Sequence, residues 1–171
     1  TRLGTSGWDV VVPHEDTAAV WVALESLGAV PVGFHVWEQL RVDYGWPVTG
    51  VDFGDENIPL EADKLADTID WDKGCYIGQE VIAMMHYRGR PNKHLGKMTF
   101  QSLPEDYAPG LPLTLESGKA AGRLGSITAF ADGTFVGLAV VKRRHAEDGA
   151  TLVAPCGTTG TFKRFPKYVV D

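Results

Sequence analysis

The second half of the chain is a series of short apolar runs, and this pattern restricts the possible folds more than any other feature. Turn-forming dipeptides separate several runs, among them Ser117-Gly118, Asp132-Gly133 and Asp148-Gly149. An Asp-Gly pair between apolar runs favours a hairpin, because the turn needs residues that tolerate positive φ. Six short strands within about 80 residues predict a small antiparallel β-barrel. The runs are residues 95–100, 113–115, 120–129, 134–141, 151–153 and 160–165.

The first half carries mainly helical patterns. Residues 8–13, W-D-V-V-V-P, predict a strand, and Asp16 or Thr17 then caps a helix that Gly28 ends. A second helix is expected over residues 34–44. Apolar side chains recur at helical spacing in both, which predicts core packing. These side chains are Val20, Trp21, Leu24 and Leu27 in the first helix, and Val36, Trp37, Leu40 and Tyr44 in the second.

The connection that follows is irregular, and a domain boundary comes after it. Residues 48–72 are rich in Asp, Gly and Pro, which is typical of a long loop of the kind that often binds ligands. After Pro91 the sequence changes to short runs of alternating apolar residues. We therefore expect an α+β chain with one domain over 1–91 and a β-barrel domain over 92–171.

The amino-acid composition excludes several classes of protein. The 171 residues are 44% hydrophobic, which supplies a core and excludes a disordered chain. No run of eighteen apolar residues occurs, so no membrane-spanning helix is expected. The two cysteines, Cys75 and Cys156, are too few for a disulfide scaffold and favour a reducing, cytoplasmic location.

The net charge of −6 is unevenly distributed. Residues 1–72 hold 14 acidic against 3 basic residues, whereas residues 73–97 carry a net charge of +4 and also contain His86 and His94. The basic segment is either a solvated linker or a contact for an anionic partner. An overall acidic chain argues against direct, non-specific nucleic-acid binding, although it allows a local phosphate or carboxylate contact.

The segment K-G-C-Y-I-G-Q-E at residues 73–80 carries the clearest chemistry. Two glycines bracket Cys75 and Tyr76, so the backbone can turn tightly there. Lys73 and a following helix over 79–86 would favour the Cys75 thiolate, the form that is nucleophilic or binds metal. The alternative is a small buried core cysteine. No C-x-x-C or four-cysteine pattern is present, so the chain has no metal-binding set of its own. His86 is a base or ligand candidate, or a packed surface residue.

These residues lead to a resemblance. K-G-C-Y-x-G-Q-E with the downstream Y-R-G resembles the signature of the YgfZ family of folate-binding proteins, which are relatives of the glycine-cleavage T-protein, an aminomethyltransferase. Other matches extend over nearly the whole chain. They are R-L-G-T-S-G at 2–7, L-R-V-D-Y-G-W-P at 40–47, N-I-P-L-E at 57–61 and G-R-L-G-S-I-T at 122–128.

The resemblance implies a fold, a cofactor and partners. The fold would be the C-terminal part of a T-protein-like folate-binding domain, a ferredoxin-like α/β piece, followed by the barrel. The implied function is support of iron–sulfur protein assembly or repair and of tRNA modification, with tetrahydrofolate as cofactor. Partners would be iron–sulfur client or assembly proteins and a tRNA-modifying enzyme. The functional thiolate would be Cys75, assisted by Lys73. Cofactor contacts would come from Trp8, Trp37, Tyr76, Gln79, Glu80 and Arg88, and Arg88 and Arg90 would meet an anionic partner or the folate tail.

Departures from the aminomethyltransferase pattern favour an accessory protein over a conventional enzyme. Thr5 and Trp8 stand where that branch has the tyrosine and glutamate that face folate, and Trp37 replaces an arginine. These changes remove hydrogen-bonding groups for a pterin, although Trp8 or Trp37 could stack on one. Met84 also replaces a common arginine. A folate-dependent aminomethyltransferase stays as the enzymatic alternative.

Two further expectations concern the ends of the chain. Family members carry a segment upstream of the position that matches Thr1, so residues 1–48 are expected to expose apolar surface that such a segment would cover. The terminal residues either close the barrel as a strand or form a single-stranded RNA platform of aromatic and basic side chains. That alternative rests on Phe162, Lys163, Arg164, Phe165, Lys167 and Tyr168.

Overall fold

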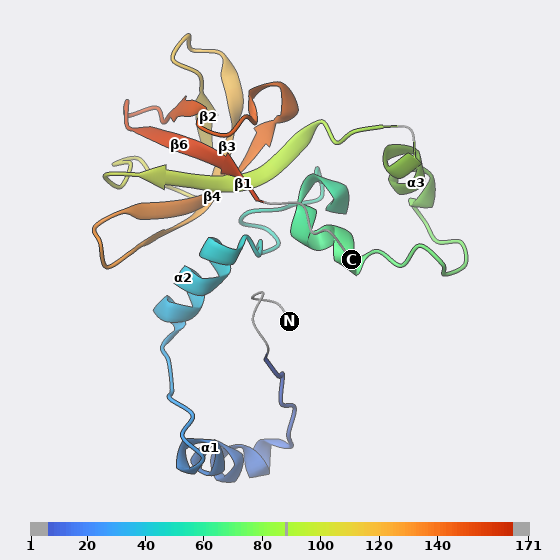
Figure 1. Ribbon diagram of the computed structural model, residues 1–171, viewed down its shortest axis with the longest axis vertical. Coiled ribbons are helices and arrows are strands. Elements are labelled where there is room, and N and C mark those ends of the chain that lie inside the picture. The colour runs from blue at the N-terminus through green and yellow to red at the C-terminus, as the bar shows by residue number, and fades with distance from the viewer. Residues whose placement is uncertain (1–6, 88, 166–171) are drawn as a thin grey trace.

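A closed six-stranded antiparallel barrel forms the larger part of the protein (Figure 1). The computed structural model describes residues 7–87 and 89–165. Around the barrel, neighbouring strands follow the order β1-β4-β3-β2-β5-β6. The predicted mixed fold ending in a small antiparallel barrel is therefore confirmed. The strands are β1 (Lys93–Phe100), β2 (Leu111–Thr114), β3 (Ala120–Ala129), β4 (Phe135–Lys142), β5 (Thr151–Val153) and β6 (Thr159–Arg164).

Strand β6 closes the barrel by pairing with β1, in a register that sets Phe162 opposite Met98. Both of these side chains are fully buried, and Phe165, just beyond the strand, is 8% exposed. Aromatic side chains that fill a core cannot stack on bases. The RNA platform is therefore wrong for Phe162 and Phe165, whereas its Lys167 and Tyr168 lie outside the described residues.

Two of the three predicted turns connect neighbouring strands. Gly118 and Gly133 adopt positive φ in the β2–β3 and β3–β4 hairpins. The hairpin expected at Asp148-Gly149 is wrong, because β4 and β5 are not neighbours in the barrel. β5 pairs instead with β2 and β6, and the turn into β6 contains Gly157 with φ 89°. The closed barrel, rather than the local turn, therefore determines which strands pair with β5.

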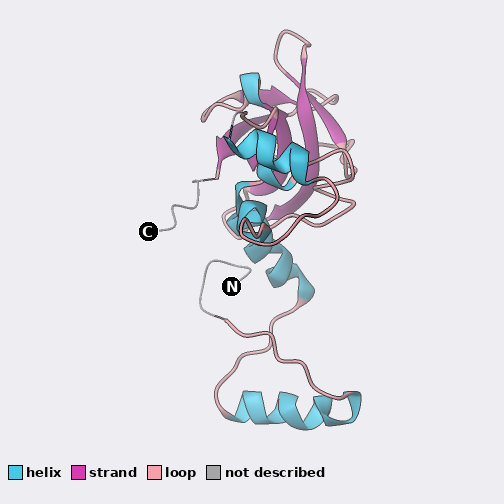
Figure 2. Cartoon of the chain, turned by 90° about the vertical axis from the view of Figure 1, so that its right-hand side faces the viewer, coloured by secondary structure: helices cyan, strands magenta, loops and turns pink. Residues whose placement is uncertain are grey.

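In the described residues before the barrel there are three α-helices, and their positions agree with the sequence patterns. They are α1 (Thr17–Ser26), α2 (Phe34–Tyr44) and α3 (Gln79–Tyr87). Gly28 and Gly45 follow α1 and α2 with φ of 94° and 90°, a conformation that glycine adopts without the strain of a Cβ. The connection between α2 and α3 is irregular apart from the 3₁₀ helices η2 (Pro59–Glu61) and η3 (Asp63–Thr68). Helix α2 lies against the barrel, and α1 lies at the opposite end of the molecule from it (Figures 1 and 2).

The strand expected over residues 8–13 does not form. The part of the chain described before Lys93 contains no strand, only an isolated bridge between Thr49 and Phe53. An extended segment becomes a strand only when a neighbour supplies hydrogen bonds, and residues 8–13 have no such neighbour in the described chain. Trp8 is consequently 94% exposed.

The predicted apolar stripes are largely exposed rather than packed in a core. Helix α1 buries no residue, and its Trp21 is 53% exposed, while the adjacent Leu27 is 84% exposed. In α2 the buried residues are Arg41 and Val42, whereas the expected Leu40 is 49% exposed. The exposed apolar surface does agree with the separate expectation for residues 1–48.

The barrel core around Met98 and Phe162 is one apolar cluster, and another packs the irregular connection against the barrel. It unites Val42 of α2 and Ala62 with barrel residues such as Leu95 and Leu138, all at most 2% exposed. Phe165 covers Gly45 so closely that a Cβ there would lie 2.7 Å from the ring. The packing of residues 42–65 therefore crosses the boundary predicted between 91 and 92, which stays a prediction.

Candidate functional site

The motif at residues 73–80 occupies an exposed turn that leads into α3. The Asp70 carboxylate accepts hydrogen bonds from the backbone N–H groups of Asp72 at 3.0 Å and Lys73 at 3.1 Å. Gly78 then adopts φ 89°, and the Tyr76 N–H donates to Gln79 Oε1 at 3.3 Å. Local hydrogen bonds at both ends thus shape the loop that carries Cys75.

Cys75 is exposed, so the alternative of a buried core cysteine is wrong. Lys73 is exposed as well, and its Nζ lies 4.5 Å from the centre of the Tyr76 ring in a cation–π contact. The turn therefore presents a thiol to solvent with an ammonium group two residues away. The second cysteine, Cys156, is also exposed but lies in the β5–β6 turn.

His86 contributes to packing rather than to the motif. Its ring stacks on Trp71 with ring centroids 4.0 Å apart, and its edge meets Tyr87 at 4.8 Å. The stack joins α3 to the residues just before Lys73, and it supports the position of the loop.

The structure does not gather the predicted cofactor residues. Tyr76, Gln79 and Glu80 lie together at the start of α3, whereas Trp8 and Trp37 lie on segments well apart from it (Figures 1 and 2). Arg88 is outside the described residues. None of the other five side chains, all of which the structure describes, lines the cavity between α3 and the barrel. Within the described ranges 7–87 and 89–165, the predicted pterin contacts form no common pocket.

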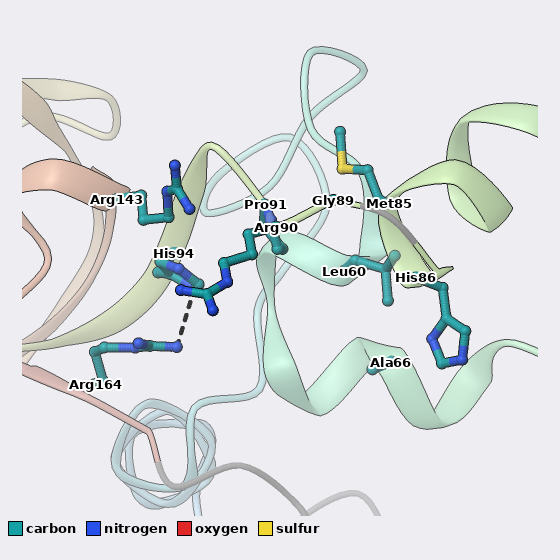
Figure 3. Close-up of a pocket in the computed structure, with 10 residues that line it drawn as sticks. All are labelled: Leu60, Ala66, Met85, His86, Gly89, Arg90, Pro91, His94, Arg143 and Arg164. Atoms are coloured by element: carbon teal, nitrogen blue, oxygen red, sulfur yellow. Dashed lines mark hydrogen bonds between the residues drawn. The ribbon is translucent and has the colours of Figure 1, made fainter.

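A cavity of about 550 Å³ lies between α3, η2 and η3 on one side and the barrel on the other (Figure 3). Among the described side chains, Leu60, Ala66 and Met85 give its helical wall an apolar part. Its barrel wall is basic. The lining residues are Leu60, Ala66, Met85, His86, Gly89, Arg90, Pro91, His94, Arg143 and Arg164.

The basic wall is assembled from three parts of the chain, namely residues 90–94, Arg143 and Arg164. Arg164 Nη2 lies 3.3 Å from His94 Nδ1, and His94 is only 6% exposed. Because a guanidinium only donates hydrogen bonds, this contact makes Nδ1 the acceptor and places the ring proton on Nε2. The sequence pointed to Arg90 and His94 through the basic segment 73–97. It gave no signal for Arg143 or for Arg164 in this role, because only barrel closure brings them to residues 90–94.

A buried ion-pair network fixes α2 to the barrel, and the sequence patterns did not reveal it. Arg41 Nη1 donates to Asp52 Oδ2 at 3.0 Å, and Nη2 donates to Ser126 Oγ at 2.6 Å. Arg41 and Asp52 are 3% and 1% exposed, and Glu38 pairs with the other edge of the guanidinium. Burial lowers the pKa of Arg41, but hydrogen bonds and charges of Glu38 and Asp52 outweigh it, so the pKa is raised overall.

A neighbouring network holds the loop of the N-x-P-x-E match. Buried Asn57 donates from Nδ2 to Glu61 Oε2 at 2.8 Å and accepts at Oδ1 from Arg123 Nη2 at 3.0 Å. Arg123 also pairs with Glu56. The matched Asn57 and Glu61 are therefore inward-facing supports of the connection between α2 and α3.

Tyr107, which hydrogen-bonds to β3, predicts how the stability of the protein changes at alkaline pH. Burial, followed by the negative charge of Asp52, raises the pKa of Tyr107 above its usual value near 10, and its hydroxyl donates to the Gly125 carbonyl at 2.8 Å. A raised folded-state pKa stabilises the fold fully below about pH 10, and this stabilisation is lost as pH rises further. We expect Tyr107→Phe to flatten the alkaline fall in the free energy of unfolding, measured by urea titration between pH 9 and 11. Exposed Tyr87→Phe is the control, and an unchanged slope in Tyr107→Phe would contradict the assignment.

The described residues contain no helix long and apolar enough to cross a membrane, and the same part of the chain groups no three potential metal ligands. No protein-family model matches the sequence.

Comparison with characterised proteins finds relatives among transferases. A chloroplastic protein of Arabidopsis thaliana, provisionally named a transferase, is 31% identical over 166 residues, which cover 96% of this chain and 37% of that protein. An aminomethyltransferase of Frankia alni is 29% identical over 92% of this chain and 44% of its own length. An aminomethyltransferase of Xanthomonas campestris is 35% identical over 94 residues. The chain thus spans less than half the length of each of these relatives.

The fold is also similar to that of a solved aminomethyltransferase. The crystal structure of the glycine cleavage system aminomethyltransferase T from Bartonella henselae superposes with a TM-score of 0.68 over 90% of this chain and 44% of that one, at 18% identity. Sequence similarity and shared fold together support a relationship to the T-protein-like superfamily.

Proposed function

We propose that this chain belongs to a folate-binding accessory protein of the YgfZ type, which supports iron–sulfur protein assembly or repair and, through it, tRNA modification. The observation that carries the proposal is the exposed Cys75 on the glycine-bracketed turn K-G-C-Y-I-G-Q-E. A cysteine kept for packing would be buried, whereas one that meets a partner must be accessible.

Cys75 would act together with a partner. One thiolate cannot hold a cluster alone, since such clusters need about four protein ligands. The chemically sensible role is one transient ligand or sulfur contact, with the remaining ligands supplied by an iron–sulfur client or assembly protein. Lys73 lies two residues from the thiol, and the bare glycines leave room for the partner to approach. A tRNA-modifying enzyme is one such client, and the cytoplasm is the proposed location.

Tetrahydrofolate belongs to this proposal, but the described residues do not fit it as an enclosed pocket. Trp8 and Trp37 lie apart from Tyr76, Gln79 and Glu80, so we assign no folate geometry or reaction step to them. The exposed apolar side chains of residues 8–40 would supply part of a folate-domain surface.

Replacing Cys75 tests the proposed role, and the chain provides its own control. We expect Cys75→Ala to reduce an iron–sulfur-dependent tRNA thiolation in cells by at least about tenfold, because the only thiol in the motif is lost. Cys156→Ala removes the other exposed thiol and should leave thiolation unchanged. Thiolated nucleosides would be measured by mass spectrometry of total tRNA. Equal thiolation in Cys75→Ala and the parent protein would reject this role.

The second candidate is a folate-dependent aminomethyltransferase. The names of the Frankia and Xanthomonas relatives favour it. Trp8 and Trp37, which replace folate-facing groups of that branch, argue against it, and Thr5 lies outside the described residues. The discriminating assay is release of methylenetetrahydrofolate from an aminomethylated lipoyl carrier. Turnover that survives Cys75→Ala would favour the enzyme over the accessory role.

A further inference from the structure

The geometry points to a binding site for a small organic ammonium ion with an apolar or aromatic body, in a cavity between α2 and the barrel. The cavity has a volume of about 440 Å³, which is within the range of small-molecule sites. It shares no lining residue with the cavity between α3 and the barrel. Its own lining residues are Phe34, His35, Glu38, Leu103, Tyr107, Ile127, Thr128, Ala129 and Phe135.

The first argument is a buried hydroxyl that lacks a partner. Thr128 lines the cavity and is only 7% exposed, yet its Oγ1 forms no hydrogen bond within the described chain. A buried polar group without a partner costs free energy, which a ligand recovers when it supplies that partner. Rotation about a single side-chain bond redirects the hydroxyl, so it can meet a ligand in the cavity that Thr128 lines.

Thr128 also ends the G-R-L-G-S-I-T match, and close packing explains the two glycines of that match. A Cβ at Gly122 would come within 2.3 Å of the Val140 carbonyl oxygen. A Cβ at Gly125 would come within 2.3 Å of the Asp52 carboxylate. The threonine hydroxyl makes no hydrogen bond of this structural kind in the described chain, which leaves ligand binding as a role for it.

The second argument is the sign of the charge beside the cavity. Glu38 lines it, with a side chain that is 24% exposed, and both carboxylate oxygens accept hydrogen bonds from Arg41. A carboxylate has about four acceptor sites, so Glu38 retains capacity for a further donor. Arg41 also pairs with Asp52, so one guanidinium (+1) and two carboxylates (−2) leave this cluster with a charge of −1. A cationic ligand would balance that charge.

The histidine of the lining does not oppose a cation. The amide nitrogen of Gln39 donates to the Ala129 carbonyl at 2.6 Å, and the same nitrogen lies 3.2 Å from His35 Nε2. Because an amide nitrogen only donates, Nε2 is the acceptor of this contact, which requires the neutral form of the ring. Among the nine lining residues, all of them described, Glu38 is therefore the one charged side chain.

The third argument comes from the aromatic and apolar walls. Phe34 of α2, Tyr107 between β1 and β2, and Phe135 of β4 line the cavity. Aromatic rings attract cations, and this attraction is stronger where water is excluded. The Tyr107 hydroxyl donates to a backbone carbonyl at 2.8 Å, so its oxygen remains an acceptor. With Glu38, Thr128 and Tyr107, the cavity has three acceptors beside aromatic surface, which match the three donors of an ammonium group.

The site does not depend on the proposed function. Its lining includes neither Cys75 nor Lys73, and no described side chain that is predicted to contact folate. Trp37, one of those predicted contacts, nevertheless adjoins Glu38 in α2. The experiment therefore includes tetrahydrofolate as a competitor.

Titration of the full chain with a matched pair of probes, followed by NMR of the backbone amides, tests the site. Benzylamine is an ammonium ion at neutral pH, and benzyl alcohol is its uncharged counterpart. We expect benzylamine to bind at least about tenfold more tightly than benzyl alcohol, and to shift the amide signals of residues 34–38 and 127–129. Equal affinities, no saturable binding of benzylamine, or shifts confined to other residues would overturn the proposal.

Thr128→Val replaces the unpartnered hydroxyl by a methyl group of similar size. We expect it to weaken benzylamine binding by about tenfold, the typical effect of losing one hydrogen bond to a charged group. Thr161→Val is the control, because it makes the same change at an exposed position of β6 outside the cavity lining. Its benzylamine affinity should stay within about twofold of the parent chain. Equal weakening in the two variants would overturn the assignment of the hydroxyl to the site.

Glu38→Gln tests the charge separately, because Asp52 still pairs with Arg41 in this variant. We expect the affinities for benzylamine and benzyl alcohol to differ by no more than about threefold, since the carboxylate that selects the cation is lost. An unchanged preference for benzylamine would overturn the proposal.

An excess of tetrahydrofolate should leave the benzylamine affinity unchanged. Displacement of benzylamine would overturn the proposal, because the cavity would then be part of a folate site. Neither result decides the tRNA thiolation of Cys75→Ala, so failure of this site is distinguishable from failure of the proposed function.

Discussion

Asp52→Asn is expected to lower the free energy of unfolding by about 3–5 kcal/mol, because it removes one of the two carboxylates that pair with the buried Arg41 guanidinium, the one that is itself buried. Asp52 is 1% exposed, and its carboxylate accepts four hydrogen bonds, three of them from α2 and β3. Its carboxylate accepts hydrogen bonds from Arg41, from the Val48 N–H, and from both the N–H and hydroxyl of Ser126. An asparagine has one acceptor oxygen and an amide that cannot pair with a cation.

The exposed pair between Lys97 and Asp43 provides the comparison. Both of its side chains are partly solvated, at 26% and 58% exposure. Ion pairs in this setting contribute at most about 1 kcal/mol, so Asp43→Asn should cost no more than that. Urea unfolding followed by tryptophan fluorescence measures both variants. A loss in Asp52→Asn as small as that in Asp43→Asn would mean that the network does not stabilise the attachment of α2 to the barrel.

Phe162→Ala is expected to destabilise the protein by about 3–5 kcal/mol, since it removes a fully buried ring from the centre of the barrel. The ring lies over Gly96 of the neighbouring strand, where a Cβ would come within 2.3 Å of it. Phe100 covers Gly160 in the same way from β1 to β6. Each ring therefore fills the space that a glycine leaves in the paired strand. Truncation would open a cavity that the rigid barrel cannot close.

Phe34→Ala is the matched control, because it makes the same substitution at a side chain that is 75% exposed on α2. Its effect should lie within about 0.5 kcal/mol of zero, as for most surface positions. Thermal and urea unfolding of the two variants would be compared under the same conditions. Similar losses in both would show that the Phe162–Gly96 packing is not a major source of barrel stability.

The candidate site divides into a part that was predictable and a part that was not. Residues 73–80 are contiguous, so glycine spacing and the helix signal at Gln79 predicted a tight turn before α3. These signals left open whether Cys75 is exposed or buried. The basic cavity was only half visible, because Arg90 and His94 are close in sequence while Arg143 and Arg164 reach them through strand pairing. The folate contacts were transferred from a resemblance, and the arrangement of Trp8 and Trp37 did not follow from it.

Local sequence signals determined where most of the described helices and strands lie. The bounds of α2, β3 and β5 match their patterns, because helix caps, glycine turns and β-branched alternation act over a few residues. Tertiary structure decided what those elements face. The burial of Arg41 instead of Leu40 depends on Asp52 and Ser126, which lie 11 and 85 residues away. Whether residues 8–13 pair as a strand depends on a neighbour. The free energy of burying a charged side chain or of pairing a strand edge depends on partners that are distant in the sequence. A local sequence pattern therefore cannot predict it.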